Sequence, residues 1–169
     1  MKKNSFTLLE AIFAISILTL TISGSFALIS RLLSFSPQVQ SKLIASYLAQ
    51  EGIEIIRNIR DTNWVQGEEN WLKNLSTTTS YYLDHKSQKF PDDAPCNNDF
   101  LFLSTTTDDY YNCRGQGTKT KFQRKIKISE PATADCPAGN CVSIEVEVSW
   151  QEKGQTQSVK VIEHLYNWK

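Results

Sequence analysis

The sequence has no excess of charge of either sign. Its 169 residues include 18 basic and 18 acidic side chains, so the formal net charge is zero. Phosphate binding needs clustered surplus lysine and arginine, so this balance argues against nucleic acid as a partner. Glycine and proline are few, at seven and five residues, which excludes a collagen-like or low-complexity chain. The length suits one globular domain with a hydrophobic core.

Residues that commonly carry catalysis or bind metals are scarce as well. There are two histidines, His85 and His164, and neither stands in a known motif. The sequence contains no nucleophile elbow, no phosphate-binding glycine loop, no H-E-x-x-H and no paired-carboxylate signature. We therefore expect no enzymatic activity, no metal site and no cofactor. His164 follows Glu163 in a strand-like pattern, where we expect it to face solvent.

What the sequence does have is a long apolar run near its N-terminus. From Ala11 to Ser30 there are 20 residues without charge. As a helix rising about 1.5 Å per residue, they span about 30 Å, the hydrocarbon thickness of a bilayer. Lys2 and Lys3 precede the run and predict a cytoplasmic N-terminus with the remainder outside. A cleaved signal peptide usually has a shorter apolar core, whereas a plain signal anchor fits the length; neither explains Glu10.

The first residues resemble the N-terminus of type IV prepilins and the related pseudopilins. In that family a short basic leader ends in a small residue, and Phe-Thr-Leu-Ile/Leu-Glu opens a long hydrophobic helix. Lys2-Lys3-Asn4-Ser5-Phe6-Thr7-Leu8-Leu9-Glu10 follows this pattern. The resemblance covers residues 1–35 and departs from the family at Ser5, where the leader usually ends in glycine.

The resemblance implies that prepilin peptidase cuts between Ser5 and Phe6 and N-methylates the new amino terminus of Phe6. The apolar helix stays attached. In a filament the carboxylate of Glu10 would be buried, and a buried charge needs a partner, which the terminal amine of a neighbouring subunit's Phe6 can supply. The implied partners are the peptidase, other pilin or pseudopilin subunits, the inner-membrane assembly platform and the lipid bilayer.

The resemblance also implies a location and a set of machines. Before assembly the chain would cross the cytoplasmic (inner) membrane once with an extracytoplasmic head, and it would then enter a pilus or pseudopilus. The filament could serve a type IV pilus, type II secretion or DNA uptake, and the last would restore nucleic acid as a partner. The unusual head and Ser5 suggest a minor pilin. A second hypothesis is a signal-anchored adhesin or binding domain that never polymerises.

Beyond the apolar run, the sequence predicts an amphipathic continuation of the helix. Apolar residues recur at spacings of three and four between Val39 and Ile59. Pro37 predicts a kink or an interruption, because proline disfavours helical geometry in the residue before it, and Ser36-Pro37 can also start a new helix. We expect a kinked or interrupted long helix from Phe6 to Arg60.

The end of that helix is followed by a group of aromatic and charged residues. They could form a binding cluster or pack the helix end, and we favour packing. The group consists of Arg57, Arg60, Asp61, Trp64 and Trp71.

The C-terminal part alternates with the two-residue period of strands. We expect strands at Ser80–Asp84, Phe100–Leu103, Lys121–Ser129, Val142–Trp150 and Ser158–Tyr166. The last three should form an antiparallel meander packed on the helix, an α+β, pilin-like fold. The expected divisions are a leader (1–5), a transmembrane or assembly helix (6–35), an amphipathic helix half (36–62) and a β-rich extracytoplasmic head (63–169).

All four cysteines follow the apolar run, and an even number on the exported side favours disulfides. Pairing by proximity gives Cys96–Cys113 and Cys136–Cys141, although four cysteines allow three pairings. Tetrahedral zinc is the rival, but the sequence has no C-x-x-C pair and no histidine near the cysteines.

Overall fold

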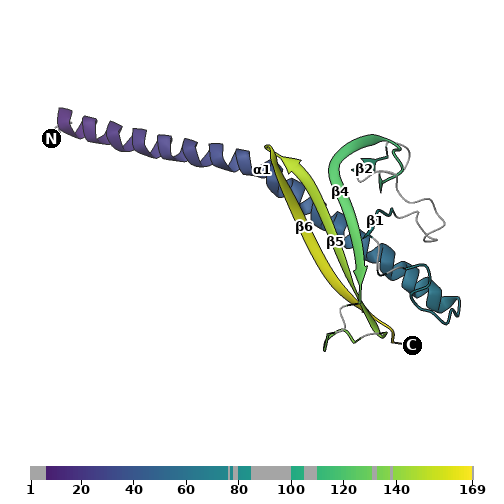
Figure 1. The fold of residues 1–169 in the computed structure, drawn as a ribbon. Helices are drawn as coiled ribbons and strands as arrows, with labels where there is room; N and C mark the ends of the chain where they lie inside the picture. Colours follow the sequence, from purple (N-terminus) through teal and green to yellow (C-terminus); the bar gives the residue numbers. More distant parts are fainter. Residues whose placement is uncertain are drawn as a thin grey trace. The chain divides into compact units, whose positions relative to one another are not determined.

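The computed structural model describes residues 7–75, 77, 80–84, 100–104, 110–130, 133–137 and 139–168. Within them one helix is followed by six strands (Figure 1). The elements are α1 (Leu8–Val65), β1 (Ser80–Tyr81), β2 (Phe100–Leu103), β3 (Tyr111–Asn112), β4 (Thr118–Ser129), β5 (Cys141–Glu152) and β6 (Gln155–Tyr166). The expected α+β class is confirmed. The chain divides into two compact units, 1–41 and 42–169, and α1 runs through both.

The described part of the first unit is helical and apolar. Its large apolar side chains are exposed, and its most apolar 18-residue window has a mean hydropathy of 2.2 with none of it buried. Hydroxyl groups in this segment donate to carbonyls three or four residues earlier, which satisfies them within the helix. These donors are Ser16, Thr19, Thr21, Ser25 and Ser34. The helix is therefore suited to an apolar surrounding.

The helix is unbroken at Pro37, so of the two expected alternatives, a kink or an interruption, the interruption is wrong. It also continues to Val65 rather than ending at Arg60. The end is set by Gly67, which adopts a positive φ of 71°. The Gly67 N–H donates to the Trp64 carbonyl at 3.1 Å, and the Glu68 N–H donates to the Asn63 carbonyl at 3.0 Å. This pair of hydrogen bonds is a Schellman motif, which favours glycine at the left-handed position.

The strands form one antiparallel sheet in the order β3-β2-β4-β5-β6, with β1 paired to β4. The expected meander β4-β5-β6 is confirmed and its strands are longer than expected. Lys153 and Gly154 join β5 to β6 with positive φ at both residues, 51° and 78°. Such a two-residue turn matches the twist of a hairpin and fixes its register. The first expected strand is shorter, at Ser80–Tyr81, and β3 was not expected.

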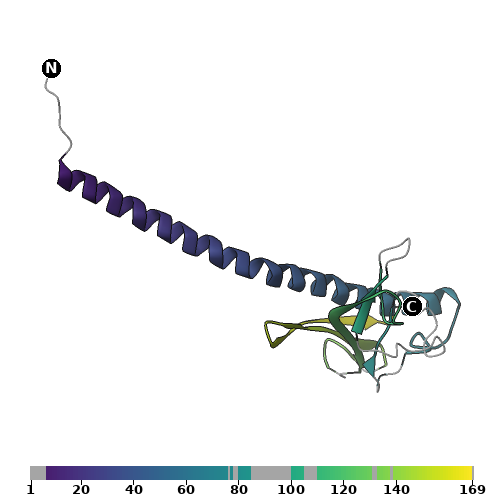
Figure 2. The ribbon, with the colours of Figure 1, turned by 90° about the horizontal axis from the view of Figure 1, so that it is seen from above.

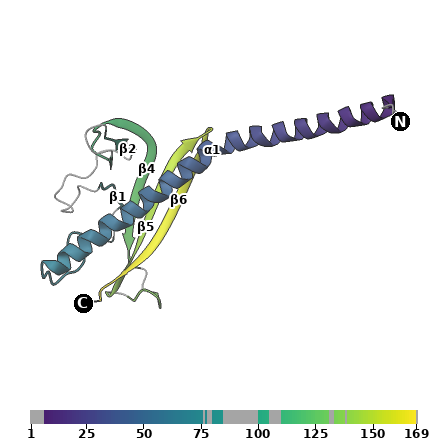
Figure 3. The same ribbon diagram turned by 180° about the vertical axis from the view of Figure 1, so that it is seen from behind.

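In the second unit the C-terminal part of α1 lies against one face of the sheet (Figures 2 and 3), and the core lies between them. The five residues of β5 expected to face inward are all buried, and so are the three expected in β4. They are Val142, Ile144, Val146, Val148 and Trp150, with Phe122, Ile126 and Ile128. The helix contributes the buried residues Ala45, Leu48, Ala49, Ile53, Ile56 and Ile59. The alternating apolar residues of the strands and the helically spaced apolar residues of α1 thus form one core.

Candidate functional site

The residues of the expected processing site lie at the N-terminal edge of the structure. Lys2, Lys3, Ser5 and Phe6 are outside the described residues. Glu10 is described and exposed in the first turn of α1.

Thr7 caps this helix start. The Glu10 N–H donates to the Thr7 hydroxyl oxygen at 3.3 Å, and the Ala11 N–H donates to the Thr7 carbonyl at 3.2 Å. Thr7 and Glu10 therefore stand as the first and fourth residues of a capping-box sequence, where a carboxylate also meets the positive end of the helix dipole. The Glu10 carboxylate is exposed at this helix start, beside exposed Leu9 and Phe13.

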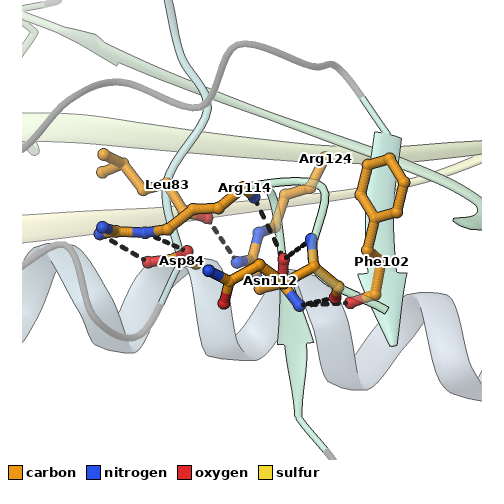
Figure 4. Close-up of polar contacts among 7 residues, drawn as sticks. Leu83, Asp84, Phe102, Asn112, Arg114 and Arg124 are labelled. Carbon is orange, nitrogen blue, oxygen red and sulfur yellow. Dashed lines mark hydrogen bonds and ion pairs between the residues drawn. The ribbon is translucent and has the colours of Figure 1, made fainter. Parts of the chain in front are cut away.

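In the head, a buried polar cluster surrounds Arg124 of β4 (Figure 4). Only 1% of this side chain is exposed. Its Nη1 donates to the Glu51 carboxylate at 2.7 Å and to the Leu48 carbonyl at 3.0 Å, both on α1. Its Nη2 donates to the Leu83 carbonyl at 2.6 Å, while Nε has no hydrogen-bond partner among the described residues. Arg124 therefore joins the helix, the sheet and the segment after β1.

The neighbouring part of the cluster holds the turn between β3 and β4 (Figure 4). Asp84 is fully buried and accepts a hydrogen bond from Arg114 Nε at 3.0 Å. Asn112 donates to the carbonyls of Phe102 and Gln116 at 3.2 and 2.7 Å, and its side-chain oxygen accepts from the Arg114 backbone N–H at 3.1 Å. These contacts satisfy buried polar groups, so the cluster is structural.

An open apolar hollow of about 300 Å³ lies beside this cluster. Ile44, Tyr47, Leu48, Glu51 and Tyr111 line it. Burial, and to a smaller degree the Glu51 carboxylate, raise the pKa of the Tyr111 phenol. Glu51 is already paired with Arg124, so the hollow presents an ion pair beside apolar and tyrosine side chains.

The tryptophans near the end of α1 pack against each other. Trp64 and Trp71 are buried, with ring centroids 6.4 Å apart, and Trp168 meets Trp64 edge-on at 4.3 Å. The Arg60 guanidinium lies 4.5 Å from the Trp64 ring centroid and pairs with Asp61 at 2.8 Å. The packing interpretation of this group is therefore the better one.

Arg57 does not join the tryptophans. It pairs with Glu54 one turn earlier and with Glu163 of β6. The hydrogen bond to Glu163 is the main reason why the pKa of Arg57 is raised. Arg57 thus connects α1 to β6.

Of the two expected disulfides, the one between Cys136 and Cys141 is confirmed. Cys136 and Cys141 form a disulfide, with Cα atoms 5.0 Å apart. Cys113 is buried and also disulfide-bonded, while Cys96 lies outside the described residues.

His164 lies on the face of the sheet away from the helix, as expected, because its neighbour Leu165 belongs to the buried face; on that outer face it is half-buried. Its ring lies beside the Cys136–Cys141 pair, and one ligand atom from each of the three residues falls within 4.8 Å of the others. The argument against zinc was that no histidine lies near the cysteines. This holds along the sequence, but in the folded chain His164 lies near Cys136 and Cys141. The register between β5 and β6 brings His164 close to Cys141, because Ser143 pairs with His164 and Cys141 pairs with Tyr166.

A long apolar N-terminal helix whose second half packs on an antiparallel sheet is now established for this chain. The architecture is pilin-like. No family model, curated protein or solved structure matches the chain. The pilin-like assignment therefore depends on the architecture and on the N-terminal residues.

Proposed function

We propose that this chain is a structural subunit, a minor pilin or pseudopilin, of a type IV pilus, type II secretion or DNA-uptake filament. Prepilin peptidase cleaves it between Ser5 and Phe6 and methylates Phe6. The chain then assembles through its apolar helix and has no catalysis of its own. One observation supports this most: the apolar part of α1 is wholly exposed, yet it belongs to the same helix that packs the core of the head.

The exposed apolar residues need a cover that water does not provide. Before assembly the bilayer supplies it, because the uncharged run has the length of a membrane span. In a filament, the equivalent helices of neighbouring subunits supply it instead. The hydroxyl groups of Ser16, Thr19, Thr21 and Ser25 donate to carbonyls of the same helix, so these polar groups suit both surroundings.

Glu10 is the exception on this apolar surface. Leu9, Ile12 and Phe13 around it are exposed apolar residues, so helix-to-helix contact there would bury the carboxylate. The methylated amine of Phe6 in a neighbouring subunit is the partner that offsets this burial. A pair of this kind forms only at one axial offset between subunits, so it sets the register of assembly.

The first test identifies the mature N-terminus. The chain is expressed with a prepilin peptidase, purified from membranes and analysed by intact and fragment mass spectrometry. We expect a chain that begins with N-methyl-Phe6. An intact Met1 would instead support the signal-anchored adhesin or binding domain.

The second test separates assembly from insertion. Glu10→Gln keeps the size of the side chain and removes its charge, so we expect normal processing and membrane insertion. We expect recovery in sheared filaments to fall at least about tenfold, because an unpaired amine costs more than about 1.4 kcal/mol. Glu69→Gln, the same change at an exposed position of the head, is the control. Equal recovery of the two variants would refute the role of Glu10.

A further inference from the structure

Three potential metal ligands from separate parts of the chain meet at one end of the sheet. Cys141 is the first residue of β5, His164 is near the end of β6, and Cys136 lies in the loop before β5. Because Cys141 pairs with Tyr166 and Ser143 pairs with His164, Cys141 and His164 are diagonal neighbours on one face. The sheet therefore holds these two side chains together whether or not the disulfide is present.

We propose that Cys136, Cys141 and His164 form a binding site for a thiophilic divalent cation, Zn²⁺, when the Cys136–Cys141 disulfide is reduced. Zn²⁺ takes thiolate sulfur at about 2.3 Å and imidazole nitrogen at about 2.0–2.1 Å, so tetrahedral ligand atoms lie about 3.5–4 Å apart. The three ligand atoms already lie within 4.8 Å of one another. Small side-chain rotations bring them to a common ion, and water takes the fourth position.

The surroundings favour such a site. Cys136 and Cys141 are 0% and 1% exposed, so an ion bound there is shielded from bulk water. Gly139, with φ of 81°, turns the loop between the two cysteines. The N–H of Asn167, the residue after β6, donates to the Asn140 carbonyl of this loop at 2.8 Å. The loop thus remains attached to the sheet beside His164 when the disulfide opens.

Reduction and metal binding follow a simple balance. A small dithiol transfers two electrons and two protons to the disulfide, which gives two thiols, and is itself oxidised to a cyclic disulfide. Binding of Zn²⁺ then releases the two thiol protons, because thiolates are the ligands. The disulfide form cannot supply thiolates, so the same residues bind metal only in the dithiol form.

Co²⁺ serves as the probe, because tetrahedral thiolate coordination gives it intense visible and near-ultraviolet absorption. The detergent-solubilised full chain is reduced with a dithiol, freed of reductant under anaerobic conditions and titrated, with circular dichroism to confirm that it remains folded. We expect one equivalent of Co²⁺ with tetrahedral bands, displaced by Zn²⁺. The oxidised chain should give none.

Variants assign the ligands. His164→Ala should weaken binding at least about tenfold, since even loss of an outer-shell partner costs 10–100-fold. His85→Ala, which removes the other histidine, should leave the affinity unchanged. Cys136→Ser with Cys141→Ser should abolish the bands. The proposal is overturned if the reduced chain binds no Co²⁺ or unfolds, if His164→Ala binds as wild type, or if the double serine variant keeps the bands through Cys96 and Cys113.

Discussion

At the scale of single residues, Arg124 shows how the head combines an apolar core with a charge. Its side chain is 1% exposed, yet three acceptors surround its terminal nitrogens: the Glu51 carboxylate and the carbonyls of Leu48 and Leu83. A buried ion pair adds little compared with an apolar replacement of both partners, but removal of one partner leaves a buried group unpaired. The main effect of removing Arg124 on stability is therefore the buried acceptors that it leaves without a donor, rather than the loss of the ion pair itself.

Arg124→Met tests this point. The change keeps an unbranched side chain but leaves the buried Leu83 carbonyl and the Glu51 carboxylate without their donor. We expect a loss of about 3 kcal/mol in the free energy of unfolding, at the low end for a broken buried pair because the Glu51 side chain is 33% exposed. Denaturant titration of the full chain in detergent, followed by tryptophan fluorescence, measures it. Lys125→Met, at the exposed neighbouring position on the opposite face of β4, should change stability by less than about 0.5 kcal/mol.

At the scale of elements, the contact between α1 and β5 depends on a glycine within the helix. A Cβ atom at Gly52 would lie 2.9 Å from a methyl carbon of Val146 and 3.3 Å from Cδ of Arg124. Glycine lowers helix propensity, so its presence here is explained by close packing rather than by local preference. The helix comes close enough to the sheet for Arg124 to reach its backbone.

Gly52→Ala should therefore destabilise the head although alanine is the better helix former. Propensity contributes about 1 kcal/mol in favour of alanine, and overpacking typically costs about 1–3 kcal/mol. We expect a net loss of about 1 kcal/mol in the same titration. Asn58→Ala introduces the same residue at an exposed position of the same helix, where propensity alone should add about 0.5 kcal/mol. Stabilisation by both changes would contradict the close approach at Gly52.

Much of this arrangement could be predicted from the sequence, because periodicity reports burial directly. The alternation of Val142, Ile144, Val146 and Val148 gave the inner face of β5. Arg124 was missed because a charged residue breaks the apolar pattern of β4, although it occupies the same face as Phe122 and Ile126. β3 was missed because two residues are too few to show a period.

The cysteine–histidine group was missed for a different reason. Its assembly depends on the register of a hairpin, which the Lys153-Gly154 turn sets. Counting outward from that turn places Ser143 opposite His164 and so brings His164 near Cys141. The sequence contained the necessary information, but the prediction needed the type of the turn at Lys153-Gly154, and neither composition nor residue spacing gives it.

At the scale of the whole molecule, the neutral, average-looking composition conceals two units with different needs. Residues 1–41 and 42–169 each form a compact unit, and all the buried apolar residues of the core follow Lys42. The first unit exposes apolar side chains that require a bilayer or neighbouring helices. The second unit buries its own core and does not depend on a bilayer or on neighbouring helices for this burial.

A fragment 42–169 should therefore fold by itself in water. We expect a monomer on gel filtration that unfolds in one cooperative thermal transition, with a midpoint within a few degrees of that of the head in the detergent-solubilised full chain.

A fragment 54–169 is the matched control, because it also lacks Ala45, Leu48, Ala49 and the Glu51 partner of Arg124. Loss of one buried leucine alone costs about 2–5 kcal/mol, against a total stability of about 5–15 kcal/mol for a domain. The shorter fragment should show no cooperative transition. If the longer fragment aggregates or binds hydrophobic dyes as a loose state, the apolar half of α1 is part of the fold of the head, and the separation of the two units is wrong.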